Sequence, residues 1–141
     1  MKKILVAIGG FSYAQRVLAE ARQLAEAMGS EVAIINVVDI SREEHYIANK
    51  DFLEDIKKGA MAHSEEMLAS AKLEFKNFTG EIETISKLGN AADEIINFAE
   101  IGGFDLIIMG SRSTGVFSRG QLGNIAEKVV HYSRVPVYII K

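Results

Sequence analysis

The sequence contains no cysteine and one proline among its 141 residues. Without cysteine there is no disulfide framework, no thiolate nucleophile and no cysteine metal site. No apolar run reaches the length of about eighteen residues that a membrane-spanning helix needs. The short apolar run at 4–8, which follows two lysines, is also too short for the core of a signal peptide. These absences fit a protein of the reducing cytosol, and we expect a cytoplasmic protein that does not enter membranes.

The chain also lacks an excess of positive charge, since its 16 Lys and Arg residues are outnumbered by 19 Asp and Glu residues and the formal net charge is −3. Broad nucleic-acid binding needs a basic face, so we expect no nucleic-acid partner. The three histidines lie far apart, without the paired spacing of a zinc site, and we expect no metal held by protein ligands alone. No G-x-S-x-G elbow and no nucleophile–base–acid set can be recognised. The sequence therefore predicts no catalytic residues and no enzyme with efficient turnover.

Strand-like apolar runs alternate with amphipathic stretches along the whole chain. The expected strands are 3–8, 31–38, 81–88, 105–109 and 135–140. The expected helices are 12–28, with Ser12 as its cap and Gly29 at its end, 51–75, a helix capped by Asn90, and 121–132, with a polar connection at 41–50. An apolar stripe on 51–75 runs from Phe52 to Phe75 and includes His63, which predicts a packed, hydrogen-bonded histidine.

This alternation predicts a single doubly wound α/β domain over 1–141, with helices on both faces of a five-stranded parallel sheet. Runs 4–8 and 106–109 are apolar on both faces and fit central strands. The polar alternation of 81–83 and the missing amide of Pro136 fit edge strands. The strand order 3-2-1-4-5 satisfies these constraints. Ligands of such sheets bind beyond the carboxyl ends of the strands where the winding reverses, which is next to Gly9 and Gly110.

The stretch 110–124 combines glycines, hydroxyl side chains and two arginines, and it leads into a helix N-terminus. Free amides and the positive end of the helix dipole attract phosphate there, and arginine can grip phosphate oxygens with two donors. The stretch matches neither the P-loop nor the G-x-G-x-x-G pattern. Two interpretations stay open at this point: a phosphate- or nucleotide-binding loop, and a plain surface loop whose glycines only permit turns.

Five segments together resemble the universal stress protein family, and the resemblance covers essentially the whole chain. They are 3–8 (KILVAI), 89–91 (GNA), 109–112 (MGSR), 122–129 (LGNIAEKV) and 135–137 (VPV). Nucleotide-binding members of that family carry Gly-x-x-Gly, nine residues, and then Gly followed by Ser or Thr. Gly110 and Gly123 match this pattern, whereas Ser113 and Asn124 depart from it. An aspartate that follows the first strand in those members is replaced here by Gly9 or Gly10.

The resemblance implies a pocket for ATP or AMP, with Mg²⁺ present only together with the nucleotide. In the family the adenine lies near the end of the second strand, which here corresponds to Val37 and Val38. The predicted ligand-binding residues are Gly9, Gly10, Val37, Met109, Gly110, Arg112, Ser113, Gly123 and Asn124.

Two hypotheses follow. The first is an adenine-nucleotide-binding stress-response or signalling protein without efficient turnover. The alternative is a dimeric stress-response interaction module from the branch of the family that does not bind ATP. An exposed apolar edge at 135–140 favours pairing with a second copy, so a homodimer through the C-terminal edge strand is expected. Under either hypothesis a protein partner would recognise a surface of this protein.

Overall fold

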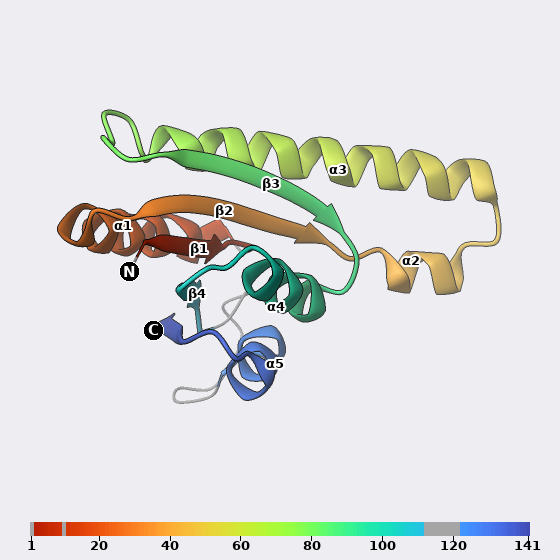
Figure 1. The fold of residues 1–141 in the computed structure, drawn as a ribbon. Helices are drawn as coiled ribbons and strands as arrows, with labels where there is room; N and C mark the ends of the chain where they lie inside the picture. The colour runs from red at the N-terminus through yellow and green to blue at the C-terminus, as the bar shows by residue number, and fades with distance from the viewer. Residues whose placement is uncertain (1, 10, 112–121) are drawn as a thin grey trace.

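A computed structural model describes residues 2–9, 11–111 and 122–141, and the side chains of all of these except 11–13. The strands are β1 (Lys3–Ala7), β2 (Glu31–Val38), β3 (Ile82–Leu88), β4 (Leu106–Gly110) and β5 (Val137–Ile140). The helices are α1 (Phe11–Met28), α2 (Ser41–Tyr46), α3 (Lys50–Leu73), α4 (Ala91–Ile101) and α5 (Asn124–Tyr132). Figure 1 shows their arrangement around one sheet.

The sheet has five parallel strands in the order β3-β2-β1-β4-β5, which confirms the predicted order and fold class. β1 lies in the middle, where Leu5 pairs with Ala33 on one side and with Ile107 on the other. Residues 4–6 are completely buried because both faces of this strand are covered. β5 lies at an edge, as predicted. It begins after Pro136, whose carbonyl accepts a hydrogen bond from the amide of Ile107 at 2.9 Å.

Each face of the sheet carries its own hydrophobic core. Ile4, Val6 and Ile34 pack toward α1 and α3, whereas Leu5 and Ile35 pack toward α4 and α5. This division follows from the alternation of side chains along a strand. A fully buried Leu or Ile side chain contributes about 1.5–3 kcal/mol, so the paired cores account for much of the stability.

The helix boundaries follow local signals that were partly visible in the sequence. The Asn90 side chain accepts a hydrogen bond from the amide of Asp93 at 3.1 Å, which confirms the predicted cap of α4. Gly29, with φ at +65°, ends α1 as predicted. The predicted cap of α1 is wrong, because that helix begins at Phe11 and Ser12 lies inside its first turn.

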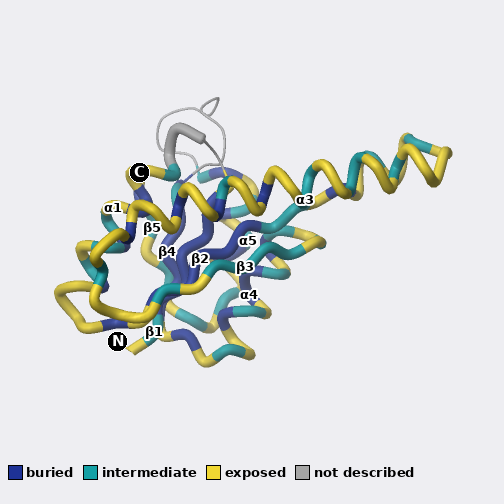
Figure 2. Tube along the Cα trace, turned by 90° about the horizontal axis from the view of Figure 1, so that it is seen from above, coloured by how far each residue is buried: buried dark blue, intermediate teal, exposed yellow. Residues whose placement is uncertain are grey.

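The region 41–75 differs most from expectation. The expected polar connection contains the six-residue helix α2. The buried residues of α3 are Ser64, Leu68 and Ala71, whereas Phe52 is 56% exposed. The predicted packed histidine is also wrong, because His63 is exposed. The reason for the exposed Phe52 is visible in Figures 1 and 2: the first half of α3 projects past the sheet, so this part of its apolar stripe has no sheet to pack against. In the second half of the helix the first buried position is Ser64 rather than its neighbour His63.

Candidate functional site

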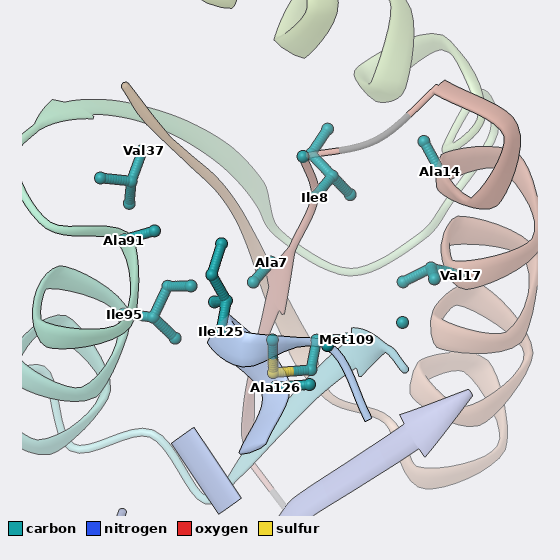
Figure 3. A pocket seen from close by; sticks show the side chains of 13 residues that line it. Ala7, Ile8, Ala14, Val17, Val37, Ala91, Ile95, Met109, Ile125 and Ala126 are labelled. Carbon is teal, nitrogen blue, oxygen red and sulfur yellow. The ribbon is translucent and has the colours of Figure 1, made fainter. Parts of the chain in front are cut away.

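A cavity of about 90 Å³ opens at the carboxyl ends of β1 and β4, the place where the winding of the sheet reverses. Figure 3 shows its apolar side chains, which come from both sides of the sheet. The lining residues are Ala7, Ile8, Gly9, Ala14, Val17, Val37, Ala91, Ile95, Met109, Gly110, Gly123, Ile125 and Ala126.

The chemistry of this lining is uniform. Every lining side chain that the structure describes is aliphatic or a thioether, and three glycines contribute only main chain. Ordinary small-molecule pockets measure about 300–1,000 Å³, so this cavity encloses part of such a ligand rather than all of it. An uncharged ring suits the enclosed part, and polar groups of the ligand would meet main-chain amides at the rim.

The rim on the β4 side is built by main-chain hydrogen bonds. The amide of Ser111 donates to the carbonyl of Ile140 at 2.8 Å, and the amide of Gly123 donates to the carbonyl of Ser111 at 2.6 Å. Gly123 is the N-cap of α5 and, as a glycine, has no side chain with which to cap this helix end. The first amides of a helix lack intrahelical partners and carry its partial positive charge. The N-terminus of α5 therefore favours an anionic or hydrogen-bond-accepting group at the rim.

The rim on the β1 side begins where that strand leaves the sheet. The amide of Ile8 still donates to the carbonyl of Ile35 at 3.0 Å, and Gly9 follows, exposed to solvent. Within the described part of the chain, no atom lies within 4 Å of the position that a Cβ on Gly9 would occupy. This rim therefore has room for a ligand group or for a larger side chain.

Five of the nine residues predicted from the sequence line this cavity together: Gly9, Val37, Met109, Gly110 and Gly123. Asn124 is the first residue of α5 and is exposed, but it lies outside the cavity lining. Gly10, Arg112 and Ser113 lie outside the described residues.

Sequence reasoning missed much of the apolar wall. The missed lining residues are Ala7, Ile8, Ala14, Val17, Ala91, Ile95, Ile125 and Ala126. The missed residues Ala7, Ile8, Ala91, Ile125 and Ala126 belong to segments that carry the family resemblance, which was a signal that could have found them. Ala14, Val17 and Ile95 are typical core residues of a helix face, and only their placement around one opening distinguishes them.

Among the described residues, no charged side chain lines this cavity. Within residues 2–9, 11–111 and 122–141, no group of three or more His, Asp or Glu side chains is placed to hold a metal ion. The pKa of the Asp105 carboxyl is lowered, first by the backbone amide of Lys3 and then by that of Lys2, at the opposite end of the sheet. None of the described helices is long and apolar enough to cross a membrane.

The sequence profile of the universal stress protein family matches residues 1–141, and the chain belongs to this family. The universal stress protein YxiE of Bacillus subtilis is 29% identical over 145 residues, covering 99% of this chain and 98% of YxiE. The solved structure of MJ0577 from Methanocaldococcus jannaschii superposes with a TM-score of 0.86 at 26% identity, covering 99% of this chain and 95% of that one.

A universal stress protein from Archaeoglobus fulgidus, solved in complex with dAMP, has the same fold. Its TM-score is 0.70 at 24% identity, and the comparison covers 100% of this chain and 98% of that one.

Proposed function

We propose that the protein is a cytoplasmic stress-response or signalling protein that binds an adenine nucleotide, AMP or ATP, without efficient turnover. The observation that carries the proposal is the apolar cavity at the reversal point of the sheet, bordered by main-chain amides and by the N-terminus of α5. Ligands of open α/β sheets bind at this position, and helix N-termini favour phosphate.

The two parts of the cavity suit the two parts of a nucleotide. The adenine would lie against Val37, Ala91 and Ile95, on the side of the cavity formed by β2 and α4. The phosphates would lie at Gly110 and Gly123, beside the first amides of α5. Magnesium would come with the phosphates of the nucleotide. A universal stress protein of the same fold, from Archaeoglobus fulgidus, was solved in complex with dAMP, which supports an adenine nucleotide as the class of ligand.

Calorimetric titration of the nucleotide-stripped protein with AMP, and with ATP and magnesium, tests the proposal. We expect micromolar binding that weakens at least tenfold in Gly123→Val, because a branched side chain at the N-cap would occupy the rim; a tenfold change corresponds to about 1.4 kcal/mol. Gly59→Val is the matched control, since Gly59 is exposed on α3 and is not among the residues that line the cavity. Absence of heat and of any thermal shift at millimolar nucleotide would overturn the proposal.

A second proposal concerns assembly through β5, as a homodimer or as the surface read by a protein partner. Ile107 and Ser111 donate to the carbonyls of Pro136 and Ile140, so even-numbered residues of this segment face β4. The main-chain groups of Val137 and Ile139 therefore point outward from the sheet edge. Such an edge is a template for pairing with another strand, and pairing with its two-fold mate closes it.

Sedimentation equilibrium tests this assembly. We expect a dimer that Tyr138→Lys converts to monomer, because the 40% exposed Tyr138 lies on the edge strand and the variant would bring like charges together across the two-fold contact. Tyr46→Lys, at a 76% exposed residue of α2, is the control and should remain dimeric. A monomeric wild-type protein at all concentrations would contradict the proposal. If nucleotide binding fails while the dimer persists, the interaction module is the better description.

A further inference from the structure

Asn36 is a buried polar residue in an otherwise apolar stretch of β2. It is 6% exposed, and the residues from Val32 to Ile35 that precede it are apolar and buried. It lies on the face of the sheet that carries α1 and α3, two residues after Ile34. Burying an amide without hydrogen bonds costs about 1–3 kcal/mol, whereas a leucine here would simply extend the core. The position of Asn36 therefore calls for a specific role.

The side chain of Asn36 belongs to a chain of hydrogen bonds that links β2, α3 and β3 to Ile8, the residue that follows β1. Its Nδ2 donates to the carbonyl of Ile8 at 2.7 Å. Its Oδ1 accepts from Oγ of Ser64 in α3 at 2.6 Å. Oγ of Ser64 also lies 2.7 Å from Oγ of Ser86 in β3. Ser64 is 1% exposed and is the first buried residue along α3. The hydroxyl of Ser64 holds the Asn36 amide with its donor toward Ile8.

This arrangement fixes the place where β1 leaves the sheet. The paired register of β1 and β2 ends at Ala7 and Ile35. Ile8 lies one residue beyond, and it is still held at its amide by the carbonyl of Ile35 and at its carbonyl by Asn36. The next residue, Gly9, is exposed and lines the cavity. Asn36 thus restrains the carbonyl of Ile8, three residues before α1 begins at Phe11.

The segment that connects β1 to α1 forms one wall of the cavity. Ile8 and Gly9 line the cavity together with Ala14 and Val17 of α1 (Figure 3). Asn36 does not itself line the cavity that the structure describes. It can affect a ligand only through the position of Ile8 and of the segment that follows.

We propose that Asn36 is a positioning residue for the nucleotide cavity, holding the β1–α1 wall in place through the carbonyl of Ile8. The proposal rests on the proposed nucleotide-binding function for its effect on affinity, but the ordering of the wall can be measured without any ligand. Ser64 and Ser86 support Asn36 from the other side and are not expected to act on the wall directly.

The test compares Asn36→Leu with Ser86→Ala. Leucine has the same number and branching of side-chain heavy atoms as asparagine and keeps the site filled, but it removes the donor to Ile8. Ser86→Ala removes one hydroxyl from the far end of the same network and leaves the bond to Ile8 intact. We expect the dissociation constant for AMP to rise about tenfold in Asn36→Leu, the size of one lost hydrogen bond, and to change less than about twofold in Ser86→Ala.

A ligand-free readout separates this inference from the proposed function. Amide ¹⁵N relaxation of Gly9 and Ala14 should show increased motion in Asn36→Leu and wild-type order in Ser86→Ala. Failure of the wild-type protein to bind either AMP or ATP would overturn the proposed function, while the relaxation data would still decide the role of Asn36. Unchanged relaxation at both residues in Asn36→Leu, or equal changes in the two variants, would overturn the positioning role.

If Asn36→Leu does not fold, the wild-type protein still tests the inference. A through-bond NMR coupling between the Asn36 carboxamide nitrogen and the carbonyl carbon of Ile8 reports the hydrogen bond directly. Detection of this coupling supports the proposal, and its absence in a well-resolved spectrum overturns it.

Discussion

The two ends of the sheet differ in how their loops are held: side chains bond the amino end together, whereas the carboxyl end has a cavity. At the amino end, the carboxylate of Asp105 accepts hydrogen bonds from the amides of Lys2 at 2.9 Å and Lys3 at 3.0 Å. The ammonium group of Lys3 donates to the carbonyl of Gly102 at 2.7 Å and lies 4.5 Å from the ring centroid of Phe104. At the carboxyl end, β1 and β4 lead to Gly9 and Gly110, with an apolar cavity between them.

Because of this difference, we expect substitutions at the two ends of the sheet to affect stability and ligand affinity differently. Side-chain contacts stabilise the amino end of the sheet. A substitution there is therefore expected to change the free energy of unfolding without changing the affinity for a ligand. Main-chain groups border the opening at the carboxyl end. A buried hydrogen-bond network centred on Asn36 holds the carbonyl of Ile8 next to this opening. Changes at that end should alter affinity, with or without a change in stability.

Phe104→Ala gives the largest expected loss of stability. Phe104 is 7% exposed, and its ring lies 5.6 Å from that of Phe98. Removing a buried phenylalanine side chain costs about 3–5 kcal/mol, because a cavity remains. Urea unfolding should show this loss, while the affinity of the folded protein for AMP stays at the wild-type value. A parallel loss of affinity would remove the distinction between the two ends.

Asn36→Asp tests the carboxyl end with a buried charge. Burial raises the pKa of a carboxyl group above its value of about 3.9 in the unfolded chain, so the ionised form destabilises the fold. We expect a loss of about 2–3 kcal/mol at pH 7 relative to wild type. The loss should shrink as the pH falls through the raised folded pKa and the group becomes protonated. Urea unfolding at neutral and acidic pH measures it, and a pH-independent difference would contradict the prediction.

Gly9→Asp tests whether the β1 rim accepts a ligand-binding side chain. No described atom would obstruct its Cβ, and an aspartate follows the first strand in family members that bind nucleotides. We expect AMP affinity to rise about tenfold through hydrogen bonds from the ribose hydroxyls, each worth more to a charged acceptor. Gly59→Asp adds the same charge on exposed α3 and serves as the control in calorimetry. Equal effects from both variants would indicate general electrostatics.

Asp105→Asn has the smallest expected effect. The amides of Lys3 and Lys2 lower the pKa of this carboxyl, so its charge stabilises the fold above its unfolded pKa. That contribution is lost as the pH falls through the lowered folded pKa. We therefore expect wild-type stability to decline more steeply than that of the variant on acidification below pH 4, with AMP binding unchanged at neutral pH. Parallel stability curves for the two proteins would contradict this role.

Much of the fold could be predicted because its signals are local. Strand-like apolar runs that alternate with amphipathic stretches marked all the strands of the described sheet, and the two-sided apolar character of β1 placed it at the centre. Asn90 and Gly29 act at the helix ends through bonds within a few residues. Gly9 and Gly110 mark the carboxyl ends of the two strands at which the sheet reverses its winding, so the location of the candidate site also followed from the sequence.

By itself, then, the sequence determined the strand order, the position of the opening and the family, because each depends on periodicity or on residues adjacent in the chain. Tertiary structure alone decided which half of α3 is buried, since an apolar stripe is buried only where another element covers it. It also decided that Asn36, Ser64 and Ser86 form one network with the carbonyl of Ile8. The hydrogen-bonded pairs in this network are separated by 22 to 28 positions in the chain. No local pattern relates these residues until the strands and α3 are packed together.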